Sequence, residues 1–348
     1  MNSSIKTLLG IAGVGAATVV TARAIVRRRR RIELAGRTAI VTGGSRGLGL
    51  VLARELVDAG VRVALLARTD ADLLSAESEL RQRGGVVETF ICDVSDRAQV
   101  EAAVRQAEAA LGPIDLLFNV AGIIEVGPLD AMTEEDFRKS MDVNCWGILH
   151  TTRAVLPGMR KRRFGRIVNI ASMGGKRAVP HMLPYAASKF AAVGLSNGLR
   201  AELAKDGILV STICPSLMRT GSPRNATFKG QHRKEYAWFS IGDSLPIASM
   251  DARTAARQTI DACRHGDGEV LLRGPLNVGV TLQSLFPSLT RESLALVNRF
   301  LPEMGGIGKE SAYGYESFSE WSPSFLTQLT EAAAKRNNEL RPRPADAT

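Results

Sequence analysis

Cysteine and histidine, which build disulfide frameworks and many metal centres, are scarce in this sequence. Only four of each occur among 348 residues. No two cysteines have C-x-x-C spacing and no histidines have metal-ligand spacing; the residues are Cys92, Cys145, Cys214, Cys263, His150, His181, His232 and His265. We therefore expect buried thiols in a reducing compartment, without a disulfide framework or a metal site.

The sequence also lacks a basic surface spread along its length, although its formal net charge is +10. Residues 1–36 carry Lys6, Arg23 and the run Arg27–Arg31 against Glu33 alone, so +6 of that charge is local. Nucleic-acid binding needs basic residues gathered over a face of the folded domain. We expect no nucleic-acid partner. Apolar and charged contents of 45% and 23% are those of a globular protein.

Residues 7–22 contain no charged residue, and five arginines follow at positions 27–31. The stretch is shorter than the roughly 20 apolar residues of a typical spanning helix. A cleaved signal peptide carries its charge before the apolar stretch, and an amphipathic soluble helix needs a polar face that this stretch lacks. A membrane anchor with its arginines on the cytoplasmic side agrees best with the positive-inside rule. We expect residues 1–31 to form that anchor, with the remaining chain on the cytoplasmic side.

Tyr185 and Lys189 are four residues apart in the stretch Leu183–Phe190. On a helix that spacing places both side chains on one face. An ammonium group beside a phenol favours the phenolate and lowers a pKa that starts at about 10. Such a phenol can pass a proton to or from an alcohol or ketone oxygen. Since many surface helices carry this spacing by chance, the assignment depends on what else the chain supplies.

A glycine-rich turn lies between a predicted strand and a predicted helix near the start of the chain. The strand Thr38–Thr42 runs into Gly43-Gly44-Ser45-Arg46-Gly47-Leu48-Gly49, and a helical pattern follows. Glycines let backbone N–H groups approach a pyrophosphate, and the helix N-terminus favours its negative charge. The spacing is G-x-x-x-G-x-G, and its strand–turn–helix context predicts a dinucleotide site.

The end of the second predicted strand bears on which dinucleotide is bound. An NAD-specific fold often places Asp or Glu there to hold the ribose 2′-hydroxyl, whereas this strand ends in Ala67-Arg68. Arg68 and Arg46 are suited to a 2′-phosphate. The alternative is that both arginines are merely solvated. The pattern favours NADP(H) over NAD(H).

Along residues 38–272, short apolar runs typical of strands alternate with stretches that have the periodicity of a helix. The predicted strands are 38–42, 62–67, 86–92, 114–118, 166–171, 208–214 and 269–272; the helices are 50–57, 70–83, 95–111 with Ser95 as its N-cap, 133–156, 184–205 and 252–263. Such alternation requires right-handed crossovers and a parallel sheet covered on both faces. We predict an α/β fold, a Rossmann-type doubly wound seven-stranded parallel sheet.

In these features the chain resembles the short-chain dehydrogenase/reductase family over residues 36–274. The resemblance rests on Thr42-Gly43-x-x-x-Gly47-x-Gly49, Asp93, Asn119-Val-Ala-Gly122, Asn144, Ser172, Tyr185-x-x-x-Lys189 and Pro215, in this order and spacing. Two positions depart from the family pattern. Val120 stands where a second Asn is frequent, and Ser216 stands where a Gly often follows the proline.

The resemblance implies a catalytic set of four residues. Tyr185 would be the general acid or base, and Lys189 would lower its pKa and hydrogen-bond the nicotinamide ribose. Ser172 would hold the substrate oxygen. Asn144 would position a water that links Lys189 to solvent. The implied cofactor-binding residues, for NADP(H), are Gly43, Ser45, Arg46, Gly47, Leu48, Gly49, Arg68, Asp93, Val94, Asn119, Ala121, Gly122, Tyr185, Lys189, Pro215 and Thr220.

Residues 215–251 match the region that covers the substrate in that family, and they are aromatic-rich. This favours a hydrophobic carbonyl or alcohol substrate of lipid, steroid or retinoid type, although ordinary lid packing also explains it. His181, Met182 and Leu183 are further candidates to face the substrate. Residues 275–348 exceed the usual core and read as a helical extension that closes the pocket, contacts a partner or rests on a membrane. The family commonly pairs helices matching 133–156 and 184–205, which implies a homo-oligomer.

We therefore expect three parts: an anchor over 1–31, an NADP-binding catalytic domain over 36–274 and an extension over 275–348. The expected function is a membrane-anchored NADP(H)-dependent oxidoreductase that interconverts a ketone or aldehyde and an alcohol. A catalytically silent NADP-sensing or scaffold protein is the alternative, but it leaves the complete set of four catalytic residues unexplained. A purely structural membrane tether leaves it unexplained as well.

Overall fold

The computed structural model describes residues 18, 21–247, 249–272 and 277–340. The apolar core of the expected anchor, residues 7–22, lies almost wholly outside this set. Residues 21–30 are helical, and the described part of the chain contains no helix long and apolar enough to cross a bilayer. This helix is tied to the body, because Arg27 pairs with Asp261 and with Asp267 at 2.9 Å.

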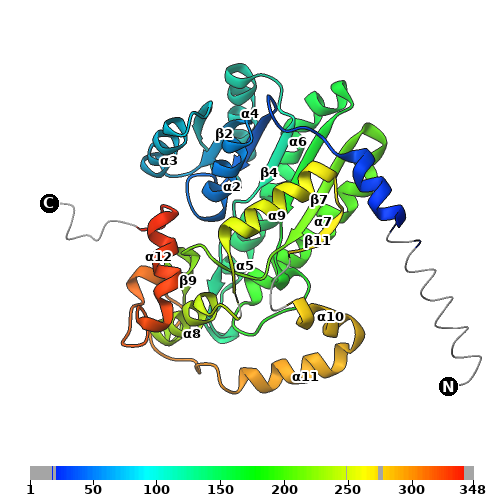
Figure 1. The fold of residues 1–348 in the computed structure, drawn as a ribbon. Coiled ribbons are helices and arrows are strands. Elements are labelled where there is room, and N and C mark those ends of the chain that lie inside the picture. The colour runs from blue at the N-terminus through cyan, green and yellow to red at the C-terminus, as the bar shows by residue number, and fades with distance from the viewer. Residues whose placement is uncertain (1–17, 19–20, 248, 273–276, 341–348) are drawn as a thin grey trace, which may run out of the picture.

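A seven-stranded sheet forms the centre of the molecule (Figure 1). Its order is β11-β7-β6-β4-β1-β2-β3, and every neighbouring pair is parallel. The strands are β1 (Thr38–Thr42), β2 (Arg62–Ala67), β3 (Val87–Ile91), β4 (Leu116–Asn119), β6 (Gly165–Ile170), β7 (Ile208–Cys214) and β11 (Glu269–Leu271). The predicted doubly wound parallel sheet is confirmed.

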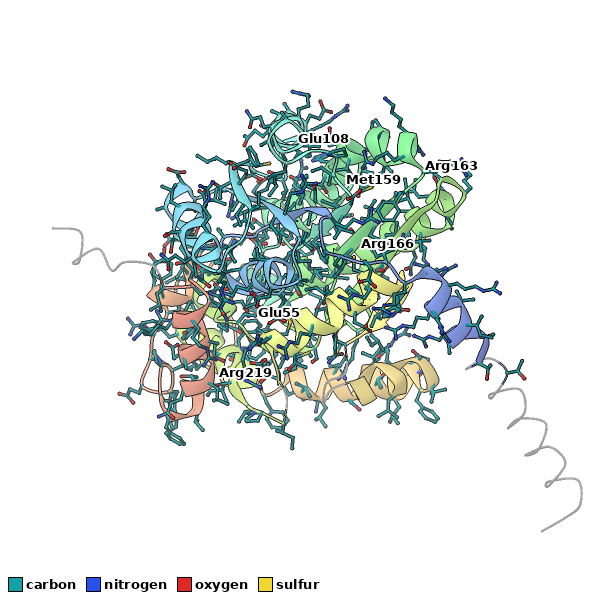
Figure 2. The ribbon with its side chains drawn as sticks, turned by 45° about the horizontal axis from the view of Figure 1, so that its top comes forward. Glu55, Glu108, Met159, Arg163, Arg166 and Arg219 are labelled. Atoms are coloured by element: carbon teal, nitrogen blue, oxygen red, sulfur yellow. The ribbon has the colours of Figure 1, made fainter. Side chains whose placement is uncertain are left out.

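Helices cover both faces of this sheet because consecutive strand residues point to opposite sides. Ala39 and Val41 enter one apolar core with α2 (Gly47–Asp58), α3 (Asp70–Gln82) and α9 (Ala252–His265). Ile40 enters the other, with α4 (Arg97–Leu111), α6 (Gly147–Arg162) and the end of α7 (Leu183–Leu203). On the first face, Glu55 of α2 pairs with Arg253 and Arg257 of α9 (Figure 2).

Two helical predictions need correction. The expected single helix over 133–156 consists of α5 (Glu134–Met141), a π-helical turn (Asp142–Trp146) and α6. The predicted cap of α4, Ser95, is one residue early. Asp96 is the cap, because its carboxylate accepts from the backbone N–H groups of Ala98 and Gln99, which a carboxylate does well at a helix start.

The segments that cover the carboxyl end of the sheet form two small sheets and four helices. They comprise β5 (Glu125–Val126), β8 (Leu217–Arg219), β9 (Thr227–Phe228), α8 (His232–Ser244), β10 (Ser249–Asp251), α10 (Asn277–Leu285), α11 (Pro287–Asn298), β12 (Ala312–Tyr313) and α12 (Gln328–Arg336). β10 pairs with β8, and β12, β9 and β5 form the other sheet. The expected helical extension over 275–348 is helical in α10, α11 and α12 and also contains the short strand β12.

Candidate active site

A cavity of about 290 Å³ lies at the carboxyl ends of β1, β2, β4 and β6. From β1 the chain continues to β2 on one side of the sheet, and from β4 it continues to β6 on the other side. The strand order therefore reverses between β1 and β4. Ligands bind at such switch points in open α/β sheets. The predicted residues that line the cavity are Gly43, Ser45, Arg46, Gly47, Leu48, Gly49, Arg68, Asp93, Val94, Ala121, Gly122, Tyr185, Lys189 and Thr220.

The floor of the cavity is formed by the loops after β1 and β4. Thr42 Oγ1 accepts hydrogen bonds from the backbone N–H groups of Val120 and Ala121, at 3.0 and 3.1 Å. Gly43 has φ +64°, and a Cβ there would lie 2.9 Å from the Cα of Ala121. Only glycine combines that backbone conformation with so close an approach. The glycine turn is thereby fixed against the Asn119–Gly122 segment.

The N-terminus of α2 opens into the cavity beside Ser45 and Leu48. Arg46 is the N-cap residue, and its side chain makes no capping hydrogen bond. A helix start of this kind offers backbone N–H groups and a positive dipole end to an anion. The local geometry therefore fits the diphosphate of a dinucleotide.

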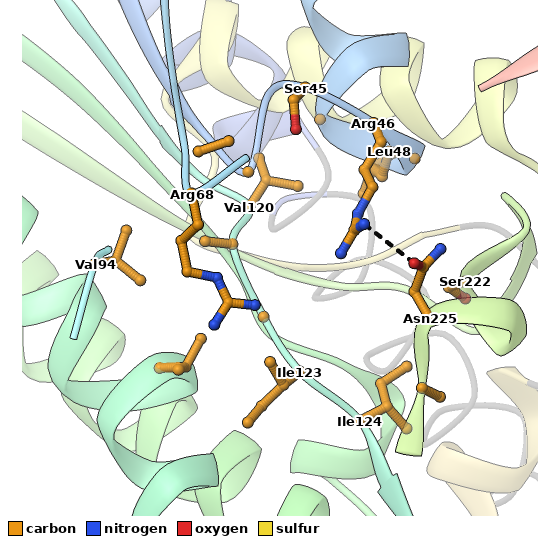
Figure 3. Close-up of a pocket in the computed structure, with 18 of the residues that line it drawn as sticks. Ser45, Arg46, Leu48, Arg68, Val94, Val120, Ile123, Ile124, Ser222 and Asn225 are labelled. Carbon is orange, nitrogen blue, oxygen red and sulfur yellow. Dashed lines mark hydrogen bonds between the residues drawn. The ribbon is translucent and has the colours of Figure 1, made fainter. Parts of the chain in front are cut away.

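The two arginines of the cofactor prediction both line the cavity, from opposite sides of it (Figure 3). Arg46 donates a hydrogen bond to Asn225 Oδ1 at 3.1 Å and lies 3.6 Å from Asp72. Arg68 lies 3.8 Å from Asp93. Arg68 is half exposed, with 54% of its side-chain surface accessible, so its weak ion pair leaves it available to a ligand.

Tyr185 and Lys189 line the cavity, and Ser172 lies beside Tyr185 without lining the cavity itself. α7 begins two residues before Tyr185, so Tyr185 and Lys189 lie one turn apart, with Lys189 Nζ 5.7 Å from the centre of the phenol ring. Ser172, directly after β6, hydrogen-bonds Tyr185. The ammonium of Lys189 donates to the carbonyl of Ile170 at 3.0 Å. These contacts unite residues from β6 and α7 around one phenol.

The expected lowering of the Tyr185 pKa does not occur in this structure. Burial raises the pKa of Tyr185 to about 12, with the Ser172 hydrogen bond opposing it, and lowers the pKa of Lys189 to about 8. Desolvation disfavours the charged form of each group, and it outweighs any attraction between them. The Tyr185 phenol is therefore protonated at neutral pH.

Asn144 is buried in the π-helical turn and holds the loop beneath the cavity. Its amide donates to Ile123 O at 3.1 Å and Ser188 Oγ at 3.0 Å, and its carbonyl accepts from Ile123 N at 3.0 Å. A Cβ on Gly122 would lie 2.9 Å from Asn144 Oδ1 and 3.4 Å from Lys189 Nζ. π-Turns frequently mark functional positions, and this one brings Asn144 close to Lys189.

Asn119 and Pro215 are two of the residues predicted to contact the cofactor. Neither lines the cavity in the described part of the chain. Asn119 points along the sheet, where it donates to Asn169 Oδ1 at 2.8 Å and accepts from Thr151 at 2.7 Å. Pro215 accepts a backbone hydrogen bond from Met173 at 2.8 Å. Both stabilise the loops that carry the site, because a buried amide or carbonyl must be hydrogen-bonded.

The structure adds polar residues that the sequence pattern did not indicate. Asp72, Asn225 and Glu339 line the cavity. Asp243 of α8 is buried, and burial raises its pKa to about 8. No local motif contains these residues, and Glu339 is far from the glycine turn in sequence, so only the folded chain could reveal them.

An apolar cluster lies next to Tyr185 and includes three buried aromatic residues of the 215–251 region. Phe228 and Tyr236 pack edge-on with ring centres 5.4 Å apart, and Met182 and Phe239 join them. His181 is buried beside this cluster and contacts Glu235 Oε1 at 2.7 Å through Nδ1. The predicted aromatic lid thus forms a compact core over the catalytic end of the cavity.

The chain is similar in sequence to known proteins over most of its length. A family model described as short chain dehydrogenase matches residues 37–229. The chain is 31% identical to 17-beta-hydroxysteroid dehydrogenase 13 of Rattus norvegicus, over 74% of this chain and 82% of that protein. It is 34% identical to a putative ketoacyl reductase of Streptomyces coelicolor, over 71% and 94%.

Two solved structures resemble the fold closely. One is a variant of actinorhodin polyketide ketoreductase with NADPH, at a TM-score of 0.63 and 31% identity, covering 71% of this chain and 98% of that one. The other is gluconate 5-dehydrogenase from Burkholderia cenocepacia in complex with NADP and tartrate. Its TM-score is 0.62 at 31% identity, and the match covers 72% of this chain and 98% of the other.

Proposed function

Because this chain belongs to the short chain dehydrogenase family, we propose that it is an NADP(H)-dependent oxidoreductase that interconverts a ketone or aldehyde and an alcohol. Membership makes it an oxidoreductase that acts on CH–OH groups with a nicotinamide cofactor. The observation that carries the finer proposal is the cluster of Tyr185, Ser172 and Lys189, of which Tyr185 and Lys189 line a cavity that reaches the glycine turn.

In the reducing direction, negative charge develops on the carbonyl oxygen as hydride reaches the carbon. The bound cofactor supplies that hydride. Tyr185, protonated at neutral pH, donates its proton to the oxygen, and the Ser172 hydroxyl donates a hydrogen bond to it. Such proton transfer accelerates the reaction by about 10²–10⁴-fold. Hydrogen-bond donors that are held in place stabilise the developing negative charge. Lys189 and Asn144 hold Tyr185 and the adjoining loop in position.

The preference for NADP(H) is supported by charge at the adenosine end of the cavity. β2 ends without an acidic residue, and Arg46 in the glycine turn and Arg68 after β2 both line the cavity. A planar guanidinium is suited to a ribose 2′-phosphate. Two structural relatives were solved with NADPH or NADP, which agrees with this choice.

A hydrophobic substrate is supported by apolar side chains that line the cavity, among them Ile123, Ile124 and Met218. The names of two relatives refer to a hydroxysteroid and to a ketoacyl substrate. We extend that class to this chain, as a lipid, steroid or retinoid-like ketone or alcohol.

Three further proposals concern the whole protein. Residues 1–31 anchor it to a membrane, with residues 36–274 as the catalytic domain on the cytoplasmic side and 275–348 as the extension. The exposed Ile25 and Val26 of the N-terminal helix are consistent with a lipid environment. Homo-oligomerisation is supported by Trp146 and Phe190, 45% and 46% exposed on the helical segments expected to pair.

The substitution Tyr185→Phe tests the catalytic assignment. It removes the proton donor and preserves the ring, so ketone-dependent NADPH oxidation should fall by at least about 10²-fold while NADPH binding persists. The assay is NADPH absorbance across a panel of steroid, retinoid and fatty-acyl ketones. Tyr315→Phe is the matched control and should retain activity.

Near-full turnover in Tyr185→Phe would refute the assigned role. If the wild-type protein binds NADPH and reduces no ketone in the panel, the silent NADP-sensing alternative is favoured. NADPH fluorescence supplies the binding measurement in both cases.

A further inference from the structure

The C-terminal segment after α12 crosses the opening of the cofactor cavity. The carbonyl of Asn337 accepts a hydrogen bond from Gly47 N–H at 2.8 Å. The side-chain amide of Asn338 donates to the carbonyls of Ser45 at 3.0 Å and Asp72 at 3.3 Å. The segment is therefore hydrogen-bonded to the glycine turn itself, at backbone groups that line the expected diphosphate site.

The opposite wall of the cavity holds the same segment. Asn337 Nδ2 donates to the carbonyl of Thr220 at 3.2 Å, and Asn225 donates to the carboxylate of Glu339. Thr220 and Asn225 both line the cavity. The three residues Asn337–Glu339 thus bridge the two walls between which a dinucleotide would lie.

Glu339 places a carboxylate in the phosphate-binding part of the cavity. Its side chain is 5% exposed, and a Cβ built on Gly47 would collide with its Oε1 atom. In dinucleotide-binding turns, a glycine at this position lets the pyrophosphate approach the backbone. Here the carboxylate of Glu339 occupies the space that the missing Cβ leaves.

The groups around Glu339 are those that would surround a bound phosphate. It lies at the N-terminus of α2, where the helix dipole favours negative charge. Arg46 donates to the same Asn225 that holds Glu339, and it also faces Asp72. A cofactor phosphate would therefore meet an acidic group and an arginine that already has internal partners.

We infer that residues 337–340 form an internal competitor of the cofactor, with the Glu339 carboxylate in the place of a cofactor phosphate. This deepens the proposed function and rests on it, because the competitor acts on the same NADP(H) site. NADP(H) binds when the segment withdraws, and the fraction of molecules with the segment withdrawn sets the apparent affinity.

The anchoring of α12 limits the movement to a short segment. Gly221 leaves no room for a Cβ beside Ala334, and Arg224 pairs with Glu331 at 2.6 Å. Arg54 donates to Arg336 O at 2.7 Å. α12 is thus packed on the domain upstream of the competitor, so only the contacts of residues 337–340 must break.

Direct NADPH binding tests this inference, by fluorescence titration of the full-length protein at fixed ionic strength. Glu339→Gln keeps the size of the side chain and removes its charge, and a chain ending at residue 336 removes the segment. Both should bind NADPH more tightly, by about tenfold if nine molecules in ten are closed. The KM for NADPH should fall in parallel.

Matched controls separate this effect from general changes. Glu310→Gln removes an exposed carboxylate elsewhere, and a chain ending at residue 340 retains Glu339; both should bind like wild type. If the chain ending at 336 fails to fold, Glu339→Gln alone decides. An unchanged or weaker affinity in Glu339→Gln overturns the inference, because a segment that clamps the cofactor would lose affinity.

The same titration distinguishes failure of the inference from failure of the proposed function. If NADPH binds all variants with one affinity, the competitor is refuted and the proposed function stands. If neither wild type nor any variant binds NADPH, the cofactor assignment fails and the competitor fails with it.

Discussion

Two buried ionisable side chains near the cavity have strongly shifted pKa values. Burial raises the pKa of Asp243 to about 8 and lowers that of Lys189 to about 8. Both shifts arise because surroundings of low polarity disfavour the charged form of the group. At pH 7 Asp243 is therefore mostly protonated, with Ser222 as a hydrogen-bond partner. Groups with such shifts gather at functional sites, and both lie close to the phenol of Tyr185.

The shift of Asp243 predicts how stability depends on pH. Between about pH 4 and 8 the folded protein keeps a proton that the unfolded chain has released, so the free energy of unfolding decreases as pH rises. Asp243→Asn removes this dependence because the amide does not titrate. We expect the variant to be more stable than wild type by roughly 1–3 kcal/mol at pH 8, with a smaller difference at pH 5.

Urea denaturation of both proteins at the two pH values measures this effect. Asp130→Asn, at an exposed position, is the control and should change neither value. A stability difference that is the same at pH 5 and pH 8 would contradict the shifted titration of Asp243.

At the scale of elements, the π-helical turn between α5 and α6 is the piece that places Asn144. α5 begins with a capping box, in which Thr133 and Asp136 bond each other reciprocally, so its start is fixed. The extra residue in the following turn changes which side chains face the site. The expected uninterrupted helix over 133–156 would have had no such change, because an α-helix keeps a constant 100° step.

Asn144→Ala tests the role of this turn. It removes three hydrogen bonds and leaves the part-buried backbone N–H and C=O of Ile123 without that partner, so we expect a loss of about 2–3 kcal/mol in the free energy of unfolding. Turnover should fall as well, because the Gly122–Ile123 loop supports Lys189. Urea denaturation and the ketone assay measure the two effects.

Thr152→Ala is the matched control on α6. The Thr152 hydroxyl is buried and has no hydrogen-bond partner among the described residues, so its loss should change stability little. If Asn144→Ala proved as mild as Thr152→Ala, the loop would be held by other contacts.

At the scale of the whole molecule, the N-terminal helix joins the expected anchor to the catalytic domain. Arg27 pairs with Asp261 and Asp267, and the Ile32 N–H donates to Arg264 O at 2.9 Å. Arg166 donates to Arg30 O at 2.9 Å (Figure 2). Residues 27–32 therefore belong structurally to the body, and a deletion that tests the anchor should end before them.

Deletion of residues 1–20 tests the proposed anchor and leaves these contacts intact. Full-length protein should be recovered with membranes and the shortened protein in the supernatant, because residues 7–20 supply most of the uncharged stretch. NADPH binding should be equal in both, as a check on folding. Equal recovery with membranes would remove the anchoring role from this segment.

The N-terminal stretch and the three-part division remain predictions. The division needs one refinement, since the extension is not separate from the catalytic domain. Its last described residues contact Ser45, Gly47 and Thr220 across the cavity. A cut at residue 275 would therefore also remove the segment that bridges the two walls of the proposed cofactor site.

The sequence by itself determined the features that depend on local order along the chain. The alternation of apolar strands and helices predicted the parallel sheet, the glycine turn predicted the place of the cavity, and the four-residue spacing placed Tyr185 and Lys189 on one face. These are short-range properties, because strand and helix periodicities are set within a few residues.

Only the tertiary structure decided what depends on packing between distant segments. It turned the Asn119 side chain into the sheet, raised the pKa of Tyr185 through burial, and brought Glu339 against Gly47. Desolvation and long-range contacts depend on which surfaces meet after folding, and no local pattern encodes which surfaces those are. The glycine turn and its partner in the C-terminal segment lie at opposite ends of the chain, so only the fold reveals that they meet.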